Sequence, residues 1–191
     1  MNKRTVKKLV QAALFLLLVG ATYFASQQQN VQQTVQKVVP PAGSYNVTKV
    51  DDGDTIMVDM DGVEEKVRFI GVDTPETKDP RKVVQCFGKA ASEFTKNLIG
   101  SNPVKLEADP TNTNRDRYNR LLRYVYLPDG TLVNAKIIEQ GYGFAYVSFP
   151  FTKLEEFKQL QTEAREQNRG LWNECDPAKN EYGGFTSNPA E

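Results

Sequence analysis

The sequence predicts an α+β domain, mainly β, in which five short strands form a barrel accompanied by three helices. Three observations predict this class. Five runs rich in β-branched residues lie between residues 45 and 127, a two-residue hairpin signal joins two of them, and three amphipathic segments lie among or after them. The length of 191 residues, with 39% hydrophobic and 25% charged residues, fits one ordinary globular core.

The strands follow from β-branched, partly alternating sequence, which suits a half-buried pleated surface. Asp61-Gly62 is a typical two-residue hairpin turn, so the first three strands form a meander. Pro128-Asp129-Gly130 marks a turn after the last strand. The five expected strands are Tyr45–Val50, Thr55–Met60, Val63–Ile70, Val104–Ala108 and Leu121–Leu127.

The helices follow from apolar residues at helical spacing and from signals at their ends. Gly100 ends a helix expected at Phe87–Ile99, and Gly141 ends one expected at Val133–Gln140. Thr152-Lys153-Leu154-Glu155 is a capping box that opens a third helix, which closes near Gly170. This order of strands and helices is that of the oligonucleotide/oligosaccharide-binding barrel (OB-fold), whose open face and loops take up polymers.

The two ends of the chain differ from the folded unit, which we place at residues 44–173. Four basic residues precede a long apolar run, so residues 1–25 are predicted to be a secretory signal or a membrane anchor helix. Residues 26–43 are predicted to be a flexible, Gln-rich linker, and residues 174–191 a disordered tail. We therefore expect an extracytoplasmic domain, secreted or tethered to the membrane only through its N-terminal segment.

The charged residues limit the possible chemistry. The chain contains no histidine, which excludes serine–histidine and cysteine–histidine triads and removes the commonest general base. Residues 1–43 carry five Lys/Arg and no acid, which leaves 19 basic and 24 acidic residues, a net charge of −5, in residues 44–191. This charge excludes a basic nucleic-acid footprint over the whole domain. Any contact with phosphate must come from local arginines and a metal ion.

Acids and arginines gather in a few short motifs of the expected barrel. Alone, Asp52-Gly53-Asp54 is more often a solvated turn, and Pro75-Glu76 is an ordinary start of a loop. Together, carboxylates beside guanidinium groups provide hard oxygen ligands for a cation and donors for a phosphate. The residues concerned are Asp52, Asp54, Arg68, Asp73, Glu76 and Arg120.

Five separated motifs, in this order and spacing, resemble those of the staphylococcal-type thermonuclease family. They are Val50-Asp51-Asp52-Gly53-Asp54-Thr55, the run from Arg68 to Lys78, Asp116-Arg117-Tyr118-Asn119-Arg120, Val133-Asn134 and Gly170-Leu171-Trp172. The resemblance covers roughly Val47 to Trp172. It implies a Ca²⁺-dependent phosphodiesterase with a staphylococcal-nuclease-like OB-fold, a monomer that cleaves DNA and RNA and leaves 3′-phosphate ends.

The resemblance also implies the ligands of the metal. Asp54 and Asp73 would supply carboxylates and Thr74 its carbonyl, with water completing the shell of about six to eight oxygens that Ca²⁺ takes. Asp52 is an acid expected behind these ligands. Glu76 would orient or deprotonate a water molecule, and the sequence leaves both roles open.

The family's phosphate and base contacts fall on two arginine-rich or aromatic segments. Arg68 and Arg120 would straddle the scissile phosphate and stabilise its growing charge. Arg117, Tyr118 and Tyr146 are candidates for substrate binding, although packing at an exposed edge is an equal alternative for the two tyrosines.

The chain departs from the family pattern at two positions. Asn119 stands where the family has glycine, and because asparagine tolerates positive φ we expect the turn to survive. Ser148 replaces a second pocket tyrosine, which puts the details of nucleotide binding in question.

Cys86 and Cys175 are the only cysteines. An export signal and an even count favour a disulfide between them, against the alternatives of two inert free thiols or a reactive thiol.

For the function, the alternative is an anchored module of the same fold that binds nucleic acid or protein without catalysis.

Overall fold

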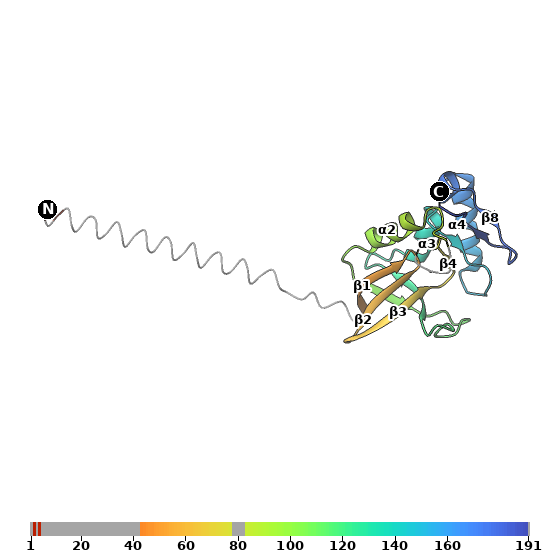
Figure 1. The fold of residues 1–191 in the computed structure, drawn as a ribbon. Helices are drawn as coiled ribbons and strands as arrows, with labels where there is room; N and C mark the ends of the chain where they lie inside the picture. Colours follow the sequence, from red (N-terminus) through yellow and green to blue (C-terminus); the bar gives the residue numbers. More distant parts are fainter. Residues whose placement is uncertain (1, 3, 5–42, 78–82, 191) are drawn as a thin grey trace. The chain divides into compact units, whose positions relative to one another are not determined.

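The computed structural model describes residues 2, 4, 43–77 and 83–190. By its internal contacts the chain divides into Met1–Val39 and Pro40–Glu191, and the barrel with its helices belongs to the second unit (Figure 1). The expected signal or anchor at residues 1–25 and the linker at 26–43 lie outside the described residues, apart from residues 2, 4 and 43. Among the described residues, no helix is both long and apolar enough to span a membrane.

Five strands close into a barrel in the order β1-β2-β3-β6-β5. Their bounds are β1 (Ser44–Asp52), β2 (Thr55–Met60), β3 (Val63–Phe69), β5 (Val104–Glu107) and β6 (Leu121–Tyr126). The β3–β6 pair is parallel and the other neighbours are antiparallel. The five-stranded barrel predicted from the sequence is confirmed, and each strand lies within two residues of its expected bounds.

The hairpin between β2 and β3 shows how the sequence fixes the barrel. Asp61 and Gly62 both have positive φ, 57° and 90°, as the tight two-residue turn requires. The turn pairs Met60 with Val63 and carries the antiparallel register down to Thr55 and Arg68. Alternate residues of both strands then face the core, and the rest face outward.

Two very short strands beside the barrel were not predicted. They are β4 (Val72–Asp73) and β7 (Phe144–Ala145), which pair antiparallel with Asp73 opposite Phe144. Two residues are too few for an alternating pattern to be read from the sequence. The pair nevertheless fixes the position of Asp73 beside the barrel.

The helices pack on the core beside the barrel (Figure 1). They are α2 (Gly88–Ile99), α3 (Val133–Glu139), α4 (Leu154–Glu166) and the short α5 (Leu171–Glu174). The three longer helices lie where the sequence predicts helices, and the third ends at Glu166, a few residues before Gly170. The predicted capping box is wrong. The residue before α4 is Lys153, without a side-chain cap, because the Thr152 hydroxyl donates to Asp109 instead.

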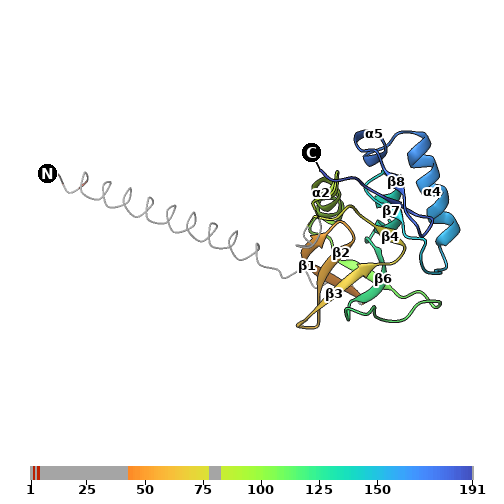
Figure 2. The same ribbon diagram turned by 45° about the vertical axis from the view of Figure 1, so that its right-hand side comes forward.

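The C-terminal segment is folded as far as residue 190, so the predicted disordered tail is a second correction. Strands β8 (Ala178–Lys179) and β9 (Phe185–Thr186) form a hairpin, and the Phe185 ring lies 5.0 Å from that of Trp172. A disulfide joins Cys86 to Cys175 just before the hairpin. Figure 2 shows the segment running past α5 to end beside α2. Its few apolar residues have no periodicity, so the sequence could not reveal that a remote surface would hold them.

Candidate functional site

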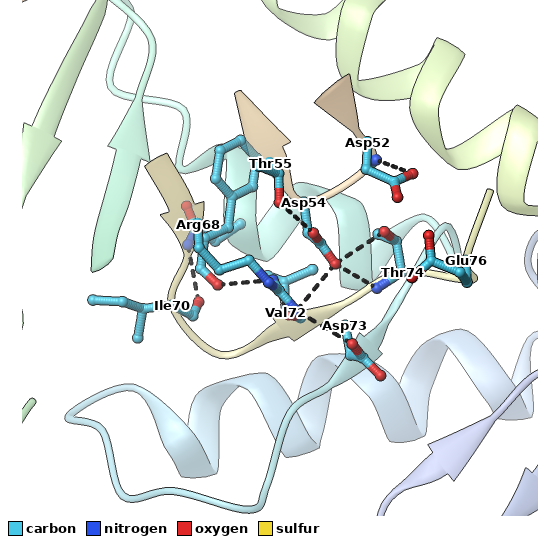
Figure 3. Close-up of polar contacts among 12 residues, drawn as sticks. Asp52, Asp54, Thr55, Arg68, Ile70, Val72, Asp73, Thr74 and Glu76 are labelled. Carbon is cyan, nitrogen blue, oxygen red and sulfur yellow. Dashed lines mark hydrogen bonds and ion pairs between the residues drawn. The ribbon is translucent and has the colours of Figure 1, made fainter. Parts of the chain in front are cut away.

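Four carboxylates gather where β1 turns into β2 and where β4 ends. Asp52 and Asp54 flank Gly53 in the β1–β2 turn, and Asp73 and Glu76 lie on the segment that faces this turn (Figure 3). The two segments are in close contact, because a Cβ atom added to Gly53 would lie 2.8 Å from the Thr74 methyl group. Glycine at this position therefore permits the approach that brings the acids together.

Asp54 is buried, with 6% of its surface exposed, and its carboxylate accepts three hydrogen bonds from two threonines. Its Oδ1 accepts a hydrogen bond from the Thr55 hydroxyl at 2.9 Å. Its Oδ2 accepts from the Thr74 amide at 2.9 Å and from the Thr74 hydroxyl at 3.0 Å (Figure 3). These bonds fix the carboxylate at the junction of the two segments.

Arg68, near the end of β3, reaches into this junction. Its Nη2 lies 3.1 Å from Asp54 Oδ2 and 3.2 Å from Asp73 Oδ1, so two carboxylates converge on one cationic nitrogen (Figure 3). Its Nη1 donates to the Val72 carbonyl at 2.6 Å, which locks the orientation of the guanidinium. The two carboxylates therefore favour positive charge at the point where they converge, and the Arg68 guanidinium supplies it.

Asp52 is affected both by burial and by the other acids of the site. Burial, followed by the neighbouring charges of Asp54 and Glu76, raises the pKa of Asp52 to about 6, although hydrogen bonds from Thr77 and Gly53 oppose the shift. The Thr77 hydroxyl donates to Asp52 Oδ1 at 2.9 Å. A raised carboxyl pKa beside other acids is a common property of functional sites.

Arg120 is held on a different loop, directly before β6. Its Nε donates to Asp116 Oδ2 at 2.7 Å, and its backbone amide donates to the other oxygen at 3.0 Å. Asn119 has a φ of 63°, so the expected left-handed turn is present with asparagine in place of glycine. β6 pairs with β3 beside Arg68, and within the part of the chain that the structure describes the Arg120 Nη groups donate no hydrogen bond.

The candidate substrate-binding residues are on the surface. Tyr118 is 59% exposed, and the guanidinium carbons of Arg117 and Arg120 lie 4.9 Å and 5.3 Å from the centre of its ring. Tyr146 follows β7, and its amide donates to the Gly71 carbonyl next to β4. Phe149, 60% exposed, lies 5.9 Å from Tyr146 between ring centres. No feature of the sequence marks Phe149 as exposed, since an isolated phenylalanine in a loop gives no signal of exposure.

The donor set suits a hard cation. Asp54 and Asp73 offer carboxylate oxygens, and the Thr74 carbonyl belongs to the same segment. Among the described residues, no group of three or more His, Cys, Asp or Glu side chains is arranged to hold a metal. A Ca²⁺ ion would therefore take two carboxylates and complete its shell with carbonyl and water oxygens, which its flexible coordination permits.

Comparison with known proteins places this arrangement in a family. The model of the staphylococcal nuclease homologues matches residues 66–174, more than half of the chain. The chain belongs to the staphylococcal nuclease family. The thermonuclease of Staphylococcus intermedius is 44% identical over 130 residues, which cover 68% of this chain and 76% of that protein. Endonuclease YncB of Bacillus subtilis strain 168 is 40% identical over 149 residues, which cover 73% of this chain and 70% of that protein.

A third relative agrees with these two, and the family resemblance read from the sequence is confirmed. The thermonuclease of Staphylococcus hyicus is 42% identical over 130 residues, which cover 68% of this chain and 75% of that protein. The range matched by the family model includes Arg68, Asp73, Glu76 and Arg120.

Proposed function

We propose that this protein is a nuclease that requires Ca²⁺, hydrolyses phosphodiester bonds in DNA and RNA, and leaves 3′-phosphate ends. Membership of the family and relatives named thermonuclease and endonuclease support the nuclease activity. The observation that carries the proposal is the Arg68 guanidinium held between the carboxylates of Asp54 and Asp73. This arrangement offers a cation site and a phosphate donor within one cluster.

In this proposal Asp54, Asp73 and the Thr74 carbonyl hold the metal. A bound Ca²⁺ would supply positive charge for a phosphoryl oxygen and for a nearby water molecule. The three hydrogen bonds to Asp54 keep one ligand fixed before the metal binds, which reduces the reorganisation that binding requires. Asp52 stands behind this ligand and adds negative charge without facing the substrate.

Glu76 is the proposed residue that orients or deprotonates the attacking water. It follows the metal-binding segment directly, and Figure 3 shows it beside Thr74 and Asp52. The Thr77 amide donates to Glu76 Oε1 at 3.1 Å, which restricts the side chain. A carboxylate so placed can accept a proton from water close to the scissile phosphate.

Arg68 and Arg120 are the proposed donors to the phosphate. The Asp116 contact anchors Arg120 through Nε and directs its fork away from that anchor. The guanidinium groups of Arg68 on β3 and of Arg120 just before the neighbouring β6 could then stabilise charge on the equatorial oxygens of the transition state. Arg117, Tyr118 and Tyr146 would contact the flanking nucleotides, with the tyrosines stacking on bases.

We also propose that the protein acts outside the cytoplasm, secreted or tethered through residues 1–25. The Cys86–Cys175 disulfide supports this location, because such bonds persist mainly in oxidising compartments.

A plasmid-nicking assay of the purified full-length chain tests the function. We expect cleavage with Ca²⁺, loss of cleavage in EDTA, and no restoration by Zn²⁺, whose preferred nitrogen and sulfur ligands are missing from the cluster. Cleavage at the full rate in EDTA would refute the metal mechanism. Tight binding of DNA without cleavage in any metal would favour the alternative, a non-catalytic binding module.

A further inference from the structure

Gln85 forms a reciprocal pair of hydrogen bonds with Glu76. The Gln85 amide donates to the Glu76 carbonyl at 2.9 Å. In return, the Glu76 amide donates to Oε1 of the Gln85 side chain at 2.7 Å. The backbone of Glu76 is thereby fixed in both directions by one residue nine positions later in the chain.

The other end of the Gln85 side chain binds the C-terminal segment, which comprises residues 176–190. Its Nε2 donates to the Ser187 carbonyl at 3.0 Å and to the Thr186 hydroxyl at 3.2 Å. One primary amide thus connects the backbone of the proposed water-orienting residue with a segment about one hundred positions away in sequence. A glutamine can make this connection because its acceptor and donor point in different directions.

Further contacts keep the C-terminal segment in place against the residues around Gln85. The Cys86 amide donates to the Asn188 carbonyl at 2.8 Å, and the Ser187 hydroxyl donates to the Cys86 carbonyl at 2.9 Å. The Ala190 amide donates to the Val84 carbonyl at 2.8 Å, so the segment adds a short backbone ladder beside Gln85. The Cys86–Cys175 disulfide closes the other end of this contact.

The start of α2 supports Glu76 from a further side. A Cβ atom added to Gly88 would lie 2.7 Å from the Thr77 methyl group and 3.0 Å from the Glu76 carbonyl oxygen. The first turn of the helix therefore packs directly against the segment that carries Glu76. This packing leaves little room for that segment to shift toward α2 while the Gln85 bonds are intact.

We infer that Gln85 is a positioning residue for Glu76, and that the C-terminal segment acts on cleavage through Gln85. The inference rests on the proposed function, in which Glu76 orients or deprotonates water. Small displacements of such a group lower the rate strongly, because the reacting atoms must lie within hydrogen-bond reach. The segment and its disulfide therefore belong to the catalytic geometry as well as to the fold.

Steady-state kinetics of Gln85→Ala in the full chain test the first half of the inference. We expect kcat to fall by about 10-fold or more while KM stays within about 3-fold, because substrate contacts are retained. Gln140→Ala is the matched control. It removes a side-chain amide that donates to Glu139 and contacts neither Glu76 nor the C-terminal segment. If Gln85→Ala does not fold, Gln85→Met replaces it, since methionine keeps the length and loses the acceptor.

Hydrogen exchange of the Glu76 amide separates a local effect on Glu76 from a general loss of stability. We expect this amide to exchange faster in Gln85→Ala, by about 10-fold or more, while amides of the β2–β3 hairpin keep their protection. A uniform acceleration over the barrel would reduce Gln85 to a stability residue and overturn the inference. A kcat within about 2-fold of wild type would overturn it as well.

A chain ended after Asp176 tests the second half. It keeps the disulfide and removes the contacts to Gln85, so we expect kcat to fall as in Gln85→Ala. In the double variant the two losses should not add, because they break one connection. Additive losses would show that the segment does not act through Gln85. If wild type does not cleave, or Glu76→Gln cleaves at the full rate, the proposed function fails instead, and exchange of the Glu76 amide still reports whether Gln85 fixes it.

Discussion

Asp109 and Asp54 are both buried carboxylates, but their neighbours differ in charge. Asp109, with 3% of its surface exposed, accepts hydrogen bonds from the Tyr124 hydroxyl at 2.6 Å and from the amide and hydroxyl of Thr152 at 2.7 and 2.6 Å. Asp54 also accepts from threonines, but it shares Arg68 with Asp73 and lies beside Asp52.

The pKa values of the buried carboxyl groups are shifted in opposite directions in the two regions. Burial alone would raise the pKa of Asp109, yet the bonds from Thr111, Thr152 and Tyr124 outweigh it and hold that pKa well below its usual range. Around Asp54 the balance is reversed, because burial and nearby acids raise the pKa of Asp52. The Asp109 carboxylate is fully satisfied by neutral donors and ties loops together. The Asp54 carboxylate belongs to a cluster whose charge suits a metal ion, at the expense of stability.

The largest expected difference between the two regions is in the effect of a substitution on kcat. Arg120→Ala should lower kcat by about 100-fold or more, because a donor to the transition state is lost. Arg120→Lys should not restore it, since the planar fork is absent from lysine. The midpoint of thermal unfolding should change little, as only a partly exposed pair with Asp116 is removed. Near-normal turnover in both Arg120→Ala and Arg68→Ala would show that the site has been misplaced.

Asp109 should give the opposite result, a loss of stability without a loss of rate. Asp109→Asn leaves the hydroxyls and the amide around it poorly paired, so we expect the free energy of unfolding to fall by about 2 to 4 kcal/mol. Urea unfolding in EDTA measures this loss, and kcat well below the unfolding temperature should be unchanged. A strong loss of kcat in the folded variant would join Asp109 to the active site and remove the contrast.

Acid should also weaken the Asp109 region. The folded pKa of Asp109 is lowered, so its contribution to the free energy of unfolding is present above the unfolded pKa of about 3.9. This contribution is lost as the pH falls below that value.

Asp52 should show a smaller effect of the opposite sign. The folded pKa of Asp52, about 6, lies above its unfolded value. The contribution of Asp52 to the free energy of unfolding is therefore full below about pH 4 and is lost as the pH rises to about 6. Asp52→Asn keeps an acceptor for Thr77 and removes this loss. In EDTA at pH 7 the variant should gain about 1 kcal/mol after allowance for solvent screening. Unfolding at pH 4 and pH 7 checks this, and parallel curves for variant and wild type would contradict it.

The sequence predicted the barrel well because its strands alternate and its hairpin carries an explicit turn signal. Asp61-Gly62 alone sets the β2–β3 register. The acids and Arg68 could be grouped in advance because they lie in short motifs at the ends of these strands. Asn119 also behaved as local chemistry predicts, with φ at 63°.

What the sequence could not predict depends on contacts between distant segments. Thr152 matches a capping box, but its hydroxyl prefers the Asp109 carboxylate, which lies 43 positions away. Phe185 has no local pattern, and it is ordered by packing on Trp172. Gln85 looks like any surface glutamine until the fold brings Glu76 and Ser187 to its two ends.

Thermal unfolding with and without Ca²⁺ tests the central claim, that the Asp54–Asp73 cluster binds the metal, most directly. A ligand that binds only the folded state raises the unfolding temperature. Ca²⁺ should therefore raise it equally in wild type and in Asp109→Asn, and should fail to raise it in Asp73→Asn. An equal rise in all three proteins, or no rise in wild type at millimolar Ca²⁺, would contradict the assignment of the metal to this cluster.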